Sequence, residues 1–132
     1  MTWVLDASAV ICWLYDEPGT QRVEDVLTGS EPLLMHAVNL VEVQYVALRR
    51  DPRGPRIVLE HLRMAGVEIV RVLDDDLLTT AVRLKASYAP IALGDAFAAG
   101  LAIQRSATLL TTDRSELEKL ADAGLCNIEF LR

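Results

Sequence analysis

The stretch WVLDASAVICWL, residues 3–14, decides how this chain begins to fold. Its first three residues are apolar and favour a β-strand, and residues 8–14 are too apolar for a helix on the surface. Asp6 stands between the two segments. The stretch therefore predicts a buried strand that leads directly into a buried helix, with a carboxylate at the junction.

The same alternation continues along the chain. Short apolar runs predict further strands at residues 32–35, 67–72, 108–111 and 128–131. Between them, apolar residues recur at helical spacing and are bounded by glycine or proline, which predicts helices. One helix is expected from Asn39, a candidate N-cap, to Arg50, and it contains Glu42. Gly94-Asp95 is expected to begin another helix over residues 96–107, whose small residues allow close packing. Alternating strands and helices favour an α/β fold with a parallel central sheet of about four to five strands flanked by helices. With a length of 132 residues, we expect one domain over residues 1–132.

Composition limits the class of protein. Hydrophobic residues make up 52% of the chain and the mean hydropathy is +0.25, which excludes a disordered protein. No apolar run approaches the roughly 20 residues that cross a membrane. The N-terminus lacks the features of a signal peptide, so we expect a cytoplasmic protein. Cys12 and Cys126 lack the spacing of a metal or redox motif and are expected to be reduced core residues.

Charge limits the class of partner. The formal net charge is −6, which argues against broad electrostatic binding to nucleic acid. Any contact with nucleic acid would have to be local or assisted by a metal ion. Several arginines follow the helix that contains Glu42, and Arg49 and Arg50 come first among them. They are candidates for binding a nucleic-acid backbone, and a solvated rim paired with nearby acids explains them equally well.

Two aspartates are predicted at the ends of parallel strands. Asp6 follows the strand at residues 3–5, and Asp113 follows the strand at residues 108–111. Ligands of open parallel sheets bind beyond the carboxyl ends of the strands, which favours a functional role for both residues. Taken singly, each is also explained as the cap of the helix that follows.

Two more acids have apolar neighbours on predicted helices. Glu42 lies among Leu40, Val41 and Val43, and residues 91–99 around Asp95 contain nothing that could neutralise its charge. A cation shared by the acids would offset the cost of burying them. Oxygen ligands without histidine or cysteine favour magnesium or manganese over zinc, and such an ion activates water for phosphodiester hydrolysis. The proposed ligands are Asp6, Glu42, Asp95 and Asp113.

The segments around these acids resemble the PIN-domain family, specifically the VapC-type toxins of toxin-antitoxin pairs. The similar segments are VLDASA at residues 4–9, NLVE at 39–42, LGDAFAAGLA at 93–102 and TTD at 111–113. Their order and spacing agree with the family over nearly the whole chain. Two positions depart from it: Gly94 stands where relatives often have another small or polar residue, and Leu117 lies near a common aromatic position.

The resemblance implies a PIN fold and a magnesium- or manganese-dependent endoribonuclease, a hydrolase that acts as a toxin. It makes the four acids both catalytic residues and metal ligands, with Ser8 and Thr111 as supporting hydroxyls. It also implies an RNA substrate, a cognate antitoxin that inhibits the enzyme, and a homodimer. Among the other acids, Glu116 is the one most readily placed beside the site, whereas Lys85 is expected on the surface.

Other functions remain as alternatives. His36 and His61 share no locality or supporting carboxylate, so catalysis by a histidine pair is disfavoured. A phosphatase that forms an aspartyl-phosphate would need a second aspartate after Asp6, and a receiver domain would need an acidic pair there. The alternative from another class is a catalytically silent PIN-fold module that binds a protein partner. The four intact acids argue against it.

Overall fold

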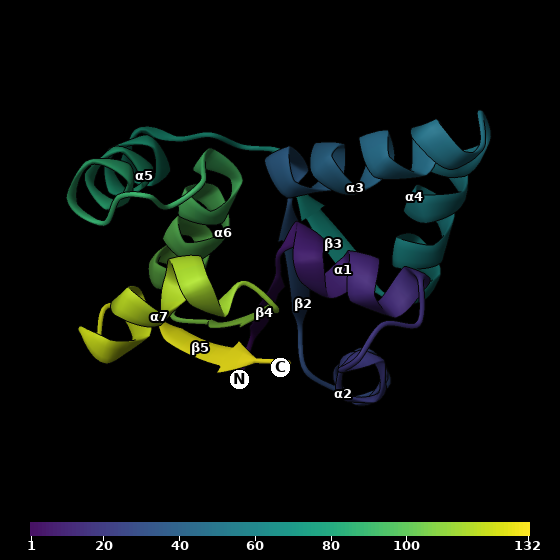
Figure 1. Ribbon diagram of the computed structural model, residues 1–132, viewed down its shortest axis with the longest axis horizontal. Coiled ribbons are helices and arrows are strands. Elements are labelled where there is room, and N and C mark those ends of the chain that lie inside the picture. Colours follow the sequence, from purple (N-terminus) through teal and green to yellow (C-terminus); the bar gives the residue numbers. More distant parts are fainter.

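The computed structural model describes residues 1–132 and contains one five-stranded sheet (Figure 1). All neighbouring strands are parallel, and their order is β3-β2-β1-β4-β5. The strands are β1 (Trp3–Leu5), β2 (Leu33–His36), β3 (Val67–Val70), β4 (Thr108–Thr111) and β5 (Asn127–Phe130). The predicted α/β fold with a parallel sheet is therefore confirmed.

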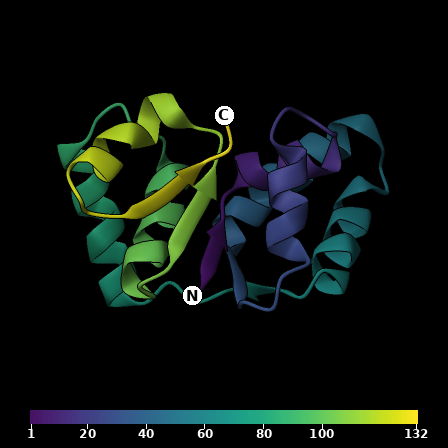
Figure 2. The ribbon, with the colours of Figure 1, turned by 90° about the horizontal axis from the view of Figure 1, so that it is seen from below.

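Helices connect the strands and cover both faces of the sheet (Figures 1 and 2). They are α1 (Ala7–Leu14), α2 (Thr20–Leu27), α3 (Ala37–Arg50), α4 (Gly54–Met64), α5 (Asp75–Ser87), α6 (Leu93–Gln104) and α7 (Arg114–Asp122). None of these helices has both the length and the apolar character that crossing a membrane requires.

The buried residues form two clusters, one on each face of the sheet. Side chains alternate along a strand, so Trp3 and Leu5 pack with helices α1 to α4, whereas Val4 packs with α5, α6 and α7. The two groups of helices lie on the right and the left of Figure 1, and they meet where α3 contacts α6. Cys12 and Cys126 are buried and free, as expected.

Helix α6 is buried from Asp95 to Ala102, because its many alanines let it approach both the sheet and α5. A Cβ atom on Gly100 would lie 3.1 Å from Leu77 Cδ1 of α5. Small residues are thus needed where these two helices pack.

Strands β2 and β5 are each shifted by one residue from the predicted ranges, and β3 ends two residues earlier. Two helix boundaries near the acidic residues differ as well. Helix α3 was expected to begin with Asn39 as its cap, but it begins at Ala37, and His36 Nδ1 accepts the cap hydrogen bond from Val38 N at 3.1 Å. Helix α6 begins at Leu93, so Asp95 lies inside its first turn. The earlier start of α3 leaves the Asn39 side chain free to bind elsewhere.

The order of strands determines where a site can form. Strand β1 lies at the centre of the sheet, and the chain passes from it to β2 on one side and returns to β4 on the other. Leu5 is in register with Leu110, so the carboxyl ends of β1 and β4 are adjacent. This is the position at which open α/β sheets bind their ligands.

Candidate metal centre

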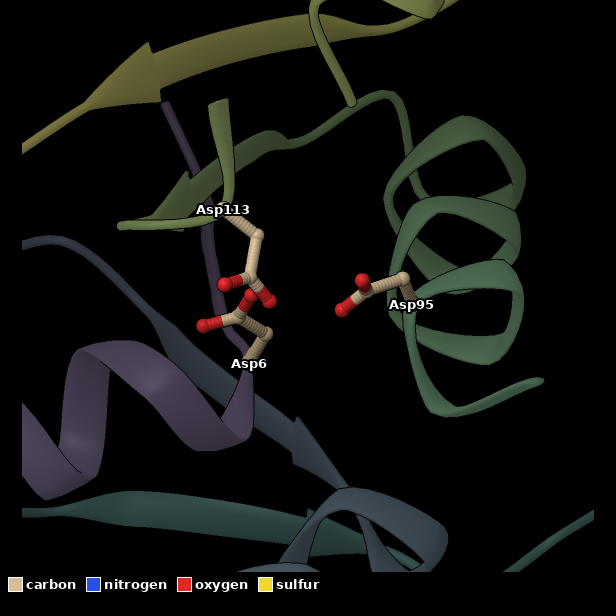
Figure 3. Close-up of side chains that lie close together, drawn as sticks. All are labelled: Asp6, Asp95 and Asp113. Atoms are coloured by element: carbon tan, nitrogen blue, oxygen red, sulfur yellow. The ribbon is translucent and has the colours of Figure 1, made fainter. Parts of the chain in front are cut away.

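Three aspartates from distant parts of the chain meet at the carboxyl edge of the sheet (Figure 3). Asp6 follows β1, Asp113 follows β4, and Asp95 points toward both from the first turn of α6. One carboxylate oxygen of each lies within 4.8 Å of the others. The structure therefore brings together three of the four predicted acids.

Asp6 serves as a helix cap as well as a member of this group. Its Oδ1 accepts a hydrogen bond from Ala9 N at 2.9 Å, which caps α1. The capping and ligand interpretations of the sequence are thus compatible, because a carboxylate oxygen has more than one lone pair. Asp113 occupies the cap position of α7 but makes no side-chain cap bond, so its carboxylate is not used by the helix.

Two hydroxyls hold the Asp6 carboxylate in place. Ser8 Oγ donates to Oδ1 at 2.7 Å, and Thr111 Oγ1 donates to Oδ2 at 2.5 Å. Thr111 Oγ1 also accepts from Asp113 N at 2.9 Å, and Ser8 Oγ accepts from Thr112 N at 2.9 Å. Ser8 and Thr111 therefore connect the first aspartate to the segment that contains Asp113.

The site is strongly acidic and mostly shielded from solvent. Burial raises the pKa of Asp6 to about 6, although the hydrogen bonds from Thr111 and Ser8 oppose the shift. Burial also raises the pKa of Asp95, and a hydrogen bond with Glu116 and the negative charges of Asp113 and Asp6 add to the effect. No lysine or arginine forms an ion pair with any of the three aspartates.

The residues present fit a divalent cation. Asp95 Oδ2 is buried and has no hydrogen-bond partner, a condition that is costly for a carboxylate. Three carboxylates within reach of one another are the hard oxygen ligands that magnesium and manganese prefer. A bound cation would both satisfy the unpartnered oxygen and balance the charge.

Glu42 lies beside the three aspartates and is not one of the group. Its carboxylate packs against Gly94 in α6, where a Cβ atom would lie 1.6 Å from Glu42 Oε1. Burial raises the pKa of Glu42, and the negative charges of Asp113 and Glu116 raise it further. Glycine at position 94 therefore leaves the space that Glu42 occupies at the rim of the site.

Two polar residues, Asn39 and Glu116, contact the start of α6. Asn39 Nδ2 donates to Gly94 O at 2.9 Å, although Asn39 had been expected to cap α3. Glu116 Oε2 accepts from Ala92 N at 3.2 Å. A hydrogen bond with Asp95 lowers the pKa of Glu116, so this acid does lie next to the site.

Arg49 and Arg50 are not beside the aspartates. They lie at the far end of α3, about 12 Å along the helix axis from Glu42 at roughly 1.5 Å per residue. Each guanidinium stacks on a tyrosine: Arg49 lies 5.0 Å from the Tyr45 ring centroid and Arg50 lies 3.8 Å from that of Tyr15.

Arg132 is a cation that acts on Asp113, and it was not predicted from the sequence. Burial raises the pKa of Asp113, and the positive charge of Arg132 is one of the effects that oppose the shift. Arg132 donates to Pro18 O at 2.8 Å and pairs with Glu17 at 3.5 Å. No local pattern marks this residue, because the segments that it joins are far apart in the sequence.

Comparisons with known proteins agree with this description. A sequence profile of the PIN domain matches residues 3–123. VapBC-1 from nontypeable Haemophilus influenzae has a similar structure, with a TM-score of 0.75 and 19% identity over 99% of this chain and 98% of that chain. No curated protein sequence matches the chain.

Two further solved structures are similar. VapBC2 from Rickettsia felis, bound to a DNA fragment from its promoter, has a TM-score of 0.78 and 16% identity over 98% of both chains. VapC20 from Mycobacterium tuberculosis, a sarcin-ricin loop cleaving toxin, has a TM-score of 0.72 and 11% identity over 89% of this chain and 94% of that chain. At these identities the likeness is one of fold. Together with the profile match, it confirms the resemblance to the PIN-domain family, and the solved structures with this fold include VapBC proteins.

Proposed function

This chain belongs to the PIN-domain family, and we propose that it is a metal-dependent endoribonuclease toxin in which residues 1–132 form a single nuclease domain. The observation that carries the proposal is the group of three aspartates, of which Asp6 and Asp95 are buried and Asp113 is half-buried, and in which Asp95 Oδ2 has no partner. A purely structural role does not explain this arrangement, because packing three carboxylates together without a cation is unfavourable.

Asp6, Asp95 and Asp113 would hold the magnesium or manganese ion, and Glu42 would complete a site of four carboxylates. A divalent ion supplies Lewis acidity and lowers the pKa of bound water, which is the chemistry of phosphodiester hydrolysis. Ser8 and Thr111 fix the orientation of Asp6 through one hydroxyl donor on each oxygen. Glu42 is half-buried at the rim, where it can accept a proton or orient a water molecule.

RNA is the proposed substrate. A chain with a net charge of −6 must rely on a few cations to bind a polyanion. Arg49 and Arg50 would contact RNA backbone that flanks the cleaved bond, since they lie about 12 Å from Glu42 along α3. The sequence that is read would depend on the shape of single-stranded RNA around the site.

A cognate antitoxin and a second copy of the chain are the proposed protein partners, and the cytoplasm is the proposed location. VapBC proteins are toxin-antitoxin complexes, and several have this fold. A groove of about 400 Å³ between α1, α2 and α4, lined in part by Trp13, Leu27 and Met64, could bind an antitoxin segment. Exposed Tyr45 and Leu48 on α3, with other apolar side chains on α3 and α5, would suit a homodimer.

The experiment is cleavage of mixed cellular RNA by the purified protein with Mn²⁺, Mg²⁺ or EDTA. Asp95→Asn keeps the shape of the side chain and removes its charge. We expect metal-dependent cleavage that falls by about 100-fold or more in this variant, since several kcal/mol of charge stabilisation would be lost. Asp122→Asn, on the exposed end of α7, is the matched control and should cleave like the wild type.

A folded wild-type protein that neither binds metal nor cleaves RNA would overturn the proposal. The catalytically silent interaction module would then be the better explanation, with the exposed apolar side chains as its binding surface.

A further inference from the structure

The start of α6 is held from outside the helix. Its cap residue is Ala92, which has no side-chain acceptor to offer. Lys85 Nζ in the last turn of α5 donates to Ile91 O at 2.5 Å, and Glu116 Oε2 in the first turn of α7 accepts from Ala92 N at 3.2 Å. Ile91 O and Ala92 N belong to the same peptide group.

This one peptide group is therefore bound on both sides by opposite charges. In a trans peptide the C=O and the N–H point in opposite directions, so the two side chains approach from opposite sides. A cation at the carbonyl oxygen and an anion at the N–H both follow the peptide dipole, and charge-assisted hydrogen bonds of this kind are stronger than neutral ones. In Figure 1, α5 lies beside the upper part of α6 and α7 lies below it.

We propose that Lys85 and Glu116 are positioning residues that clamp the 91–92 peptide and thereby fix Asp95 toward Asp6 and Asp113. Asp95 is the third residue of α6, so its backbone follows the orientation of this peptide. Ala96 N donates to Ala92 O at 3.0 Å, which closes the helical turn that contains Asp95.

Other contacts converge on the same turn. Asn39 Nδ2 in α3 donates to Gly94 O at 2.9 Å, directly before Asp95. Glu116 also contacts the Asp95 carboxyl. Asp95 Oδ2 has no partner of its own, so its position depends on the backbone and on Glu116.

A weaker interpretation is that Lys85 is an exposed lysine near a helix C-terminus, where positive charge is favourable for any helix. The two interpretations differ in what a substitution changes. A general effect on helix α5 would alter stability alone. If the two residues act as a clamp, substituting either one would speed amide exchange at the start of α6 and weaken metal binding. Amide exchange elsewhere in the protein would not change.

The inference rests on the proposed function for its metal readout, and hydrogen exchange provides a readout that does not. The variants are Lys85→Met and Glu116→Ala, with Glu116→Gln as the conservative change, because its amide oxygen still accepts from Ala92 N. Glu118→Ala and Lys119→Met, exposed on α7, are the matched controls. Mn²⁺ affinity is measured by calorimetry, and exchange of backbone amides is measured by NMR in EDTA.

We expect Lys85→Met and Glu116→Ala each to weaken Mn²⁺ binding by about tenfold, the size typical of residues that orient metal ligands. Glu116→Gln should stay within about threefold of the wild type, and the controls within about twofold. The Ala92 amide, bonded to Glu116, and the Ala96 amide, bonded to Ala92 O, should exchange at least about fivefold faster in the two clamp variants, with no matching change elsewhere.

Unchanged exchange at the Ala92 amide in both clamp variants would overturn the clamp, as would unchanged Mn²⁺ affinity when the wild type binds the ion. A wild type that binds no Mn²⁺ would refute the proposed function instead. Local exchange at the Ala92 and Ala96 amides then decides the clamp without reference to metal.

Discussion

Replacing Asp6 with asparagine should remove a pH-dependent loss of stability from the metal-free protein. Burial raises the pKa of Asp6 to about 6 from the usual 3.8. As pH rises through this interval, the unfolded chain releases the proton while the folded protein retains it. The unfolded state then binds fewer protons than the native state, so the free energy of unfolding falls as pH rises.

The magnitude follows from the two pKa values. Each pH unit between them costs about 1.4 kcal/mol, and the loss levels off above the folded pKa. Integrated from pH 5 to pH 8, the Asp6 carboxyl removes about 1.4 kcal/mol of stability. Asparagine does not titrate, so the stability of the variant relative to the wild type should rise by this amount, or about 5 °C in Tm for a chain of this size.

The assay is urea and thermal unfolding of both proteins in EDTA at pH 5 and pH 8, followed by circular dichroism. Using the difference between the two proteins removes most of the contribution of the other acids. Asp122→Asn is the control, and its difference from the wild type should not change with pH. Saturating Mn²⁺ at pH 8 should stabilise the wild type by about 2.7 kcal/mol at 100 times the Kd, and the variant by much less.

Parallel loss of stability in the wild type and the Asp6→Asn variant would refute this reasoning. It would mean that the carboxylate at the end of β1 is not the charge that folding disfavours.

Three further predictions concern residues around the site. Thr111→Val leaves Asp6 Oδ2 without its donor, so it should lower the free energy of unfolding by about 2 kcal/mol in urea titrations, with a greater loss at pH 8 than at pH 5. Thr111→Ser keeps the hydroxyl and should retain most of the stability. Equal losses in the two variants would contradict the role of the hydroxyl. Gly94→Ala should displace the Glu42 carboxylate and slow single-turnover RNA cleavage by about 10- to 100-fold, with little change in Tm. An unchanged cleavage rate would show that this position of Glu42 is not needed. Arg50→Ala should raise KM for RNA without changing kcat. It should also lower the slope of log KM against log salt concentration by about 0.7, the value for one phosphate contact to a single strand. A slope equal to that of the wild type would exclude this contact.

Much of the fold was predictable because its determinants are local. Strands and helices alternate in the sequence, and each buried strand is a short apolar run that needs no distant partner to be recognised. The alanines and glycine of α6 predicted close packing, and a Cβ on Gly100 would indeed crowd Leu77. Leu117, a departure from the family pattern, is fully buried and fills its place in the core.

The boundaries were less predictable where side chains compete for the same role. Asn39 is a better cap than histidine by preference, yet His36 caps α3. His36 also bonds to Val72 O at 3.0 Å and stacks on Phe97, contacts that depend on the packed sheet. The tertiary environment therefore overrode the local preference.

By itself, the sequence determined that the chain is an α/β protein and identified the acids at strand ends and in apolar helices, because periodicity, capping and the cost of a buried charge act over a few residues. Only the tertiary structure decided that Asp6, Asp95 and Asp113 form the compact group while Glu42 lies at its rim. It also placed Arg49 and Arg50 away from the site, and Lys85 and Glu116 on one peptide of α6. Such relations join residues that are distant in the chain, and they are determined by how the helices pack on the sheet.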